Sequence, residues 1–332
     1  MGFARLRAAV DRVGDAAGRG TRNTSLAARR HAWLLGLVSL LVATMVGCGS
    51  SGEPTAPRTG RAHPSTRPIR LAELRGRIVF SRRDDIWSAN ADGTGLRRLT
   101  SRRGPEFDPS WSPDGSRIAY RDSRRGINNN DEIYVINADG SHRRNLTHSV
   151  LNEWSPAWSP DGGLIAFFAG ELFVMRPDGS AAHAITKVEG EYPAWSPDGQ
   201  RLAFMSAEPN ASGSDPNYDV FVVNRDGSGL RQLTTWPGED GWPAWSPDGK
   251  WIAFTTTHDV VSGHYDIWVM RGDGTTKRRV APGSFPVWSP DGRFLLFSTG
   301  GAVESNSMSI ARPDGTGLRR WPIDGWLPDW RR

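Results

Sequence analysis

Aromatic side chains recur beside acidic ones at one place in a repeated pattern. An aromatic residue stands one or two positions before each of six prolines, and in five cases an acid stands close by. The aromatic residues are Phe107, Trp154, Tyr192, Trp242, Phe285 and Trp326, and the acids are Glu106, Glu153, Glu191, Asp240 and Asp324. Aromatic faces beside carboxylates suit a peptide, a cationic group or a sugar ring. We therefore predict that these residues form a binding rim.

A simpler interpretation of the same pattern stays open. Aromatic residues are more often buried than exposed, whereas acids are usually solvated. Each aromatic ring could cover the apolar core of its own repeat, with the neighbouring acids facing water. The sequence alone does not decide between the binding rim and this packing role.

Two histidines and two acids lie within nine residues between His258 and Asp266. Their spacing matches no established metal-binding motif, so the pattern favours a polar, exposed loop. If a metal were bound here, His258, His264 and Asp266 would be its candidate ligands. The sequence predicts neither a metal nor another cofactor.

Catalytic motifs are absent from the sequence. No Gly-x-Ser-x-Gly motif occurs, and no carboxylate pair is marked by its spacing as a general acid and base. We therefore expect a protein that is not an enzyme and has no catalytic residues. The alternative is a glycan hydrolase or lyase, or a glycan-binding module, of the cell envelope.

The elements that position these residues follow from a pentapeptide repeat. Trp-Ser-Pro-Asp-Gly begins at five positions, and a shortened copy, Pro328-Asp329-Trp330, stands near the end; successive tryptophans are 47, 37, 50, 43 and 42 residues apart (Trp111, Trp158, Trp195, Trp245, Trp288 and Trp330). Ser-Pro-Asp-Gly has the residue order of a type I turn with a left-handed glycine, which commonly closes a β-hairpin. An apolar strand, a second β-rich run and an Asp-Gly turn follow in each repeat. Four strands in about 40–45 residues form a propeller blade.

The two ends of the repeat region complete one blade between them. The first repeat, from Ile78 to Thr100, has the second to fourth strands but no Trp-Ser-Pro strand, and Pro328-Asp329-Trp330 supplies it. The fold class is therefore all-β, a six-bladed β-propeller closed by the N- and C-terminal strands. Closure removes the free sheet edges that favour aggregation.

These repeats resemble those of TolB-type propellers. The resemblance rests on Trp-Ser-Pro-Asp-Gly, a short apolar strand, Asp-Ile-Tyr/Trp-Val-Met, Asp-Gly-Ser/Thr and Leu-Thr, and it covers residues 76–332. It implies the propeller fold. The repeated residues build turns and blade cores, so the resemblance does not identify a ligand.

The N-terminal part has the pattern of a lipoprotein leader. Residues 1–31 are basic, residues 32–47 are apolar and uncharged, and Met45-Val46-Gly47-Cys48 resembles a bacterial lipobox. We predict a signal peptide over residues 1–47, a lipid on Cys48, a flexible Gly/Ser/Pro/Arg tether over 48–75 and the propeller over 76–332. The domain would be exported and membrane-anchored, facing the periplasm or the cell exterior.

The net charge indicates what the protein does not bind. The chain carries a formal charge of +5, but residues 1–47 hold seven arginines and two aspartates, so the remaining charges balance. A neutral domain gives no electrostatic reason to expect nucleic acid binding. We expect a monomeric binding scaffold whose partner is a cell-envelope protein or peptide.

Overall fold

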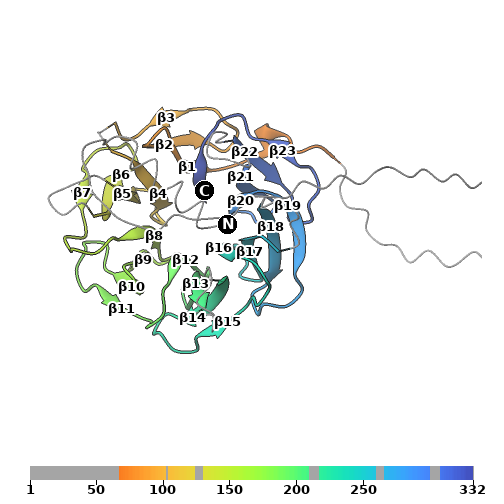
Figure 1. Ribbon diagram of the computed structural model, residues 1–332. Helices are drawn as coiled ribbons and strands as arrows, with labels where there is room; N and C mark the ends of the chain where they lie inside the picture. Colours follow the sequence, from red (N-terminus) through yellow and green to blue (C-terminus); the bar gives the residue numbers. More distant parts are fainter. Residues whose placement is uncertain are drawn as a thin grey trace, which may run out of the picture.

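The computed structural model describes residues 67–101, 104–123, 130–208, 217–258, 265–299 and 307–331. Within these ranges, strands form six four-stranded antiparallel sheets arranged in a ring, as Figure 1 shows. The prediction of an all-β, six-bladed propeller is confirmed. No helix in these ranges has the length and apolar character needed to cross a membrane.

The first blade joins the two ends of the propeller. Its sheet has the order β24-β1-β2-β3, so the last strand lies beside the first, and Ile78 pairs with Trp330. This arrangement confirms the predicted closure of the ring. The strands are β1 (Arg77–Arg82), β2 (Asp85–Asn90), β3 (Arg97–Arg98) and β24 (Trp326–Arg331).

Blades 2 to 6 each consist of four strands that are consecutive in sequence. Blade 2 contains β4 (Glu106–Trp111), β5 (Arg117–Asp122), β6 (Glu132–Asn137) and β7 (Arg144–Asn145). Blade 3 contains β8 (Trp154–Trp158), β9 (Ile165–Phe168), β10 (Leu172–Met175) and β11 (His183–Ala184). Blade 4 contains β12 (Glu191–Trp195), β13 (Arg201–Glu208), β14 (Asn217–Asn224) and β15 (Arg231–Gln232). Blade 5 contains β16 (Asp240–Trp245), β17 (Trp251–Thr256), β18 (Asp266–Arg271) and β19 (Arg278–Pro282). Blade 6 contains β20 (Ser284–Trp288), β21 (Leu295–Thr299), β22 (Ser307–Ala311) and β23 (Arg319–Arg320).

The Ser-Pro-Asp-Gly turns are held by side-chain hydrogen bonds. In blade 2, the Ser112 hydroxyl donates to Asp114 at 2.5 Å and accepts from the backbone N–H of Arg117 at 2.9 Å. The hydrogen bonds from Ser112 and Ser116 lower the pKa of Asp114 to about 2. The same serine–aspartate contact recurs in blades 3 to 6. These turns therefore fix the end of the innermost strand in five of the six blades.

The repeated tryptophans join neighbouring blades in two ways. Where the second strand of the preceding blade begins with arginine, the guanidinium lies over the indole ring, at 4.7 Å for Arg201 and Trp245. The same contact joins Arg77 to Trp111 and Arg117 to Trp158. Where an apolar residue stands at that position, the indole N–H donates to a backbone carbonyl instead, as Trp195 does to Ala157 at 3.1 Å. Both contacts hold the walls of the central channel in place.

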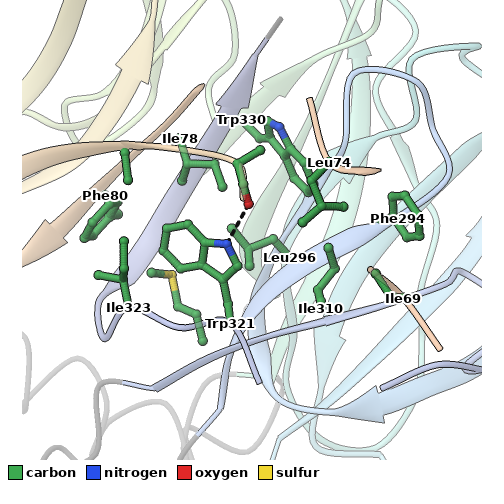
Figure 2. Close-up of a cluster of buried hydrophobic side chains, with 13 residues drawn as sticks. Ile69, Leu74, Ile78, Phe80, Phe294, Leu296, Ile310, Trp321, Ile323 and Trp330 are labelled. Carbon is green, nitrogen blue, oxygen red and sulfur yellow. Dashed lines mark hydrogen bonds between the residues drawn. The ribbon is translucent and has the colours of Figure 1, made fainter. Parts of the chain in front are cut away.

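The packed part of the protein begins before residue 76. Residues 67–75, which the sequence assigns to the tether, include the short helix η1 (Leu71–Glu73). Ile69 and Leu74 are buried in the cluster that contains Trp330 (Figure 2). Arg319 donates a hydrogen bond to the carbonyl of Ile69 at 2.8 Å. The boundary at residue 76 is therefore too late, because two apolar side chains in this segment fill the seam between blades 1 and 6. The signal peptide, Cys48 and residues 48–66 lie outside the described residues.

Candidate binding site in the central channel

The six innermost strands surround a cavity of about 390 Å³ on the axis of the ring. Its walls come from the Pro-x-Trp segments of β4, β8, β12, β16, β20 and β24, which lie nearest the centre in Figure 1. The lining extends to prolines of the Ser-Pro-Asp-Gly turns, such as Pro160 and Pro247. Proline and tryptophan have few conformations, so the walls are rigid.

Each innermost strand points one residue into this cavity from a left-handed backbone conformation. The residue directly before the proline has φ between 50° and 55° in all six blades, and strand pairing is irregular there. We call these residues the channel ring: Asp108, Ser155, Tyr192, Trp242, Phe285 and Leu327. A non-glycine residue in this conformation is strained by about 1–3 kcal/mol, and such strain clusters at functional sites.

The predicted aromatic rim occupies two different positions. Tyr192, Trp242 and Phe285 belong to the channel ring, whereas Phe107, Trp154 and Trp326 stand one residue earlier. The bulge changes the direction of the strand between these positions, so the six side chains do not form one circle.

Five of the six rings pack on one another across blades. The ring centroids are 4.4 Å apart for Trp242 and Phe285, 5.5 Å for Tyr192 and Trp242, and 5.2 Å for Phe107 and Trp326. Tyr192 and Phe285 approach to 6.4 Å although blade 5 stands between their blades. The sixth, Trp154, stacks on Phe168 of its own blade at 5.0 Å. The rings therefore gather around the axis, and most of the aromatic surface is covered by other rings.

Four of the five predicted rim acids are buried and are not among the residues that line the cavity: Glu106, Glu153, Glu191 and Asp240. The fifth, Asp324, is exposed and accepts a hydrogen bond from Arg320 at 2.8 Å. The side chains of the first four are therefore not exposed as the predicted binding rim requires. Glu106, Glu191 and Asp240 begin innermost strands, and Glu153 directly precedes β8.

Burial changes the ionisation of two of these acids. It raises the pKa of Asp240 to about 7, against the hydrogen bonds from Thr256 and Thr234 that lower it. Burial likewise raises the pKa of Glu153 to about 7, against a hydrogen bond from Ser149. Both groups consequently lose their protons near neutral pH, well above the usual range for carboxylates.

Replacing Asp240 by asparagine is expected to change the pH dependence of stability. The folded-state pKa is about 7 and the ordinary value is 3.8, so between these values the folded protein binds a proton that the unfolded chain has lost. The free energy of unfolding therefore falls as pH rises from about 4 to about 7. The Asp240→Asn variant lacks this loss, so its stability relative to wild type should be greater at pH 8 than at pH 5. Urea denaturation at both pH values measures this.

The exposed Asp324→Asn variant is the control for that experiment, and its stability should follow wild type at both pH values. A stability difference between the Asp240→Asn variant and wild type that is the same at pH 5 and pH 8 would show that Asp240 does not titrate in this range.

The polar side of the channel ring was not predicted from the sequence. The Ser155 hydroxyl donates to Asp108 Oδ2 at 3.4 Å, and Arg121 Nε lies 3.6 Å from the same oxygen. Asp329 also lines the cavity, and its Oδ2 accepts the backbone N–H of Trp111 at 2.7 Å. Their positions directly before and after the repeated proline were the available signal.

The histidine-containing loop provides no metal site in the part that the structure describes. His258 stacks on Trp236 with the ring centroids 4.2 Å apart. Asp266 is paired with Arg279 through hydrogen bonds of 2.7 and 2.8 Å. His264 lies outside the described residues. Among the described residues, no three histidine, cysteine, aspartate or glutamate side chains group closely enough to hold an ion.

Two family models match consecutive parts of the chain. The model described as the tricorn protease N-terminal beta propeller domain matches residues 71–169, and the TolB beta propeller domain matches residues 170–319. A comparison of the sequence with curated proteins found no match.

Solved structures of similar shape include two TolB proteins and a protease. TolB from Acinetobacter baumannii is 24% identical, with a TM-score of 0.64 over 77% of this chain and 66% of that one. The putative TolB from Agrobacterium tumefaciens is 20% identical, with a TM-score of 0.58 over 75% of this chain and 89% of that one. The tricorn protease is 20% identical, with a TM-score of 0.58 over 75% of this chain and 25% of that one.

These identities support the shared fold and nothing finer, and the match spans just under two thirds of the Acinetobacter TolB chain. The repeats, the six sheets and the match to the TolB propeller model agree. The chain folds as a six-bladed β-propeller, and its residues 170–319 are similar to the TolB beta propeller domain.

Proposed function

We propose that this protein is a non-enzymatic binding module of the cell envelope that holds a protein or peptide segment in its central channel. The channel ring carries the proposal. Six side chains are directed into a cavity of about 390 Å³ from strained backbone positions. A rigid, largely apolar cavity with a few polar groups is typical of a binding site.

The shape of the cavity favours an extended segment over a flat surface contact. Half-buried alanines, Ala157, Ala194 and Ala244, form the wall directly after the proline in blades 3 to 5. Their small side chains leave space where the other blades carry larger ones. A peptide side chain or a chain end fits this space, and its apolar surface would contact tryptophan and proline.

Filling the channel is the direct test of this function. Ala194 lines the cavity and also packs at the edge of the apolar cluster that contains Trp245 and Phe254. Phenylalanine in its place should narrow the cavity and abolish partner binding, and a thermal melt of the variant checks that the fold is kept. The full-length Ala194→Phe variant and wild type are each immobilised and exposed to envelope extract from cells that express the protein. Bound proteins are then compared by mass spectrometry.

The Leu230→Phe variant is the matched control, because Leu230 belongs to the same blade but is 43% exposed and does not line the cavity. Proteins retained by wild type and by Leu230→Phe but lost with Ala194→Phe support the proposal. An identical set retained by all three rejects the channel as the binding site. Retention of wall polysaccharide alone would favour the glycan-binding alternative.

Membrane anchoring through Cys48 is the second part of this proposal. It rests on the lipobox-like sequence before Cys48 and on the apolar run of residues 32–47. The Cys48→Ser variant should move from the membrane pellet to the soluble fraction after cell disruption. Equal distribution of both proteins between the fractions would remove this part of the proposal.

A further inference from the structure

The wall of the channel cavity has two chemically different sides. Blades 1 to 3 contribute four of the polar side chains, Asp329 from blade 1, Asp108 and Ser110 from blade 2, and Ser155 from blade 3, beside apolar ones such as Leu327. Blades 4 to 6 contribute Tyr192, Trp242 and Phe285 at the channel ring. A ligand that fits both sides has a polar end and an apolar or aromatic remainder.

Asp108 is a buried carboxylate whose negative charge is only partly balanced by neighbouring groups. Its residue is 8% exposed, and no hydrogen-bond partner for Oδ1 exists among the residues that the structure describes. Its cationic neighbour Arg121 also lies 3.5 Å from Asp131, so two carboxylates share one guanidinium. A buried carboxylate that is only partly paired is costly unless a further positive group approaches it.

Asp329 adds a second carboxylate to the same side of the cavity. Its contact with the backbone N–H of Trp111 occupies Oδ2, and the ion pairs among the described residues do not include it. Burial raises the pKa of Asp329 to about 6 and also raises the pKa of Asp108. A bound cation would favour the ionised form of both groups.

We propose that the channel binds a primary ammonium group, with its charge at Asp108 and Asp329 and its apolar or aromatic remainder against Tyr192, Trp242 and Phe285. The aromatic side adds attraction for a cation, which the negative face of an indole or phenol ring provides. This inference deepens the proposed function, on which it rests, since it names the chemistry of the bound segment. A lysine side chain and a free peptide N-terminus both carry this chemistry.

Three short peptides separate these sources. The first is acetyl-Gly-Trp-Lys-Gly-amide, which has a lysine and no free N-terminus. The second is the same peptide with the lysine acetylated, so it has the same shape with almost no charge. The third is Trp-Gly-Gly-amide, which has a free N-terminus and no lysine. Isothermal titration of each into the full-length protein gives the affinities.

We expect at least one charged peptide to bind ten-fold or more tightly than the acetylated one. The Asp108→Asn and Asp329→Asn variants should each weaken that binding by about ten-fold, because the charge is removed at nearly constant shape. Asparagine tolerates the left-handed conformation of residue 108 better than most residues. The Asp329→Asn variant, outside the strained position, gives a second test if Asp108→Asn folds poorly. The exposed Asp324→Asn variant should bind like wild type.

Equal affinity for the charged and acetylated peptides overturns the ammonium site but leaves channel binding intact. Unchanged affinity in both aspartate variants also overturns it. Failure of all three peptides to bind rejects ammonium recognition, while the capture experiment with Ala194→Phe decides the proposed function independently. Binding of the lysine peptide alone, or of the N-terminal peptide alone, identifies which amine the channel accepts.

Discussion

Removing residues 326–332 is expected to abolish folding of the propeller into a stable monomer. This deletion takes away β24, the innermost strand of blade 1, and leaves β1 as an open edge. Val79 and Phe80 of β1 are fully buried in the intact ring and lie at or beside the new edge. An exposed apolar edge pairs readily with other chains. Size-exclusion chromatography with light scattering should show aggregates, and tryptophan fluorescence should show no cooperative thermal transition.

Adding the strand back as a separate molecule tests the cause. A synthetic peptide of residues 326–332 supplies β24 without changing the rest of the truncated chain, which keeps Trp321. We expect it to restore monomeric, cooperatively unfolding protein when it is present during refolding, whereas a scrambled peptide should not. A truncated chain that stays monomeric and melts like the full-length protein would mean that ring closure contributes little to stability.

The fold was predictable because its signals are local and repeated. Serine, proline, aspartate and glycine each have a separate reason to occupy their position in the turn, and the turn marks the end of an innermost strand in five blades. The last blade followed from Pro328-Asp329-Trp330, which completes the first repeat. The start of the packed region was harder to predict, because Ile69 and Leu74 are isolated apolar residues whose burial depends on contact with a strand near the other end of the chain.

The candidate site was only partly predictable because its geometry depends on a bulge before the repeated proline, and the type of residue at the bulge varies from blade to blade. Aspartate, serine, tyrosine, tryptophan, phenylalanine and leucine all occupy the left-handed position before the proline. A shift of one residue along a strand moves a side chain to the other face. Aromatic residues one and two positions before the proline therefore looked equivalent in the sequence but are not in the structure.

The burial of the predicted rim acids could not be predicted from their residue type. Asp240 and Glu153 look like surface groups because carboxylates are seldom buried. Both acids are nevertheless buried in the folded ring, and this burial raises their pKa values. The residue type predicts that Asp240 and Glu153 are exposed to solvent, whereas the packing of the folded ring buries them.

Replacing Trp321 by alanine is expected to destabilise the protein more than any other single substitution considered in this article. Trp321 is 0% exposed and lies in the seam between blades 1 and 6, where Figure 2 shows it among Phe80, Leu296 and Ile323. Its indole N–H donates to the carbonyl of Ala91 at 2.8 Å, and its ring meets Phe80 edge-on with centroids 5.7 Å apart. Removing a buried tryptophan costs about 3–5 kcal/mol, and the unpaired carbonyl adds about 1–3 kcal/mol.

Trp251→Ala is the matched control, since it makes the same change at a half-buried tryptophan of blade 5 that is covered by Arg271 and Arg278. Thermal unfolding should show Tm lower by on the order of 10 °C for Trp321→Ala, and by only a few degrees for Trp251→Ala. Trp321→Phe should fall between them, because it keeps a ring against Phe80 and loses the hydrogen bond to Ala91. The seam packs blade 1, which closes the ring, against blade 6, so a large loss at Trp321 means that ring closure depends on this packing as well as on the hydrogen bonds of β24. Equal Tm values for the two alanine variants would instead assign closure to the strand pairing alone.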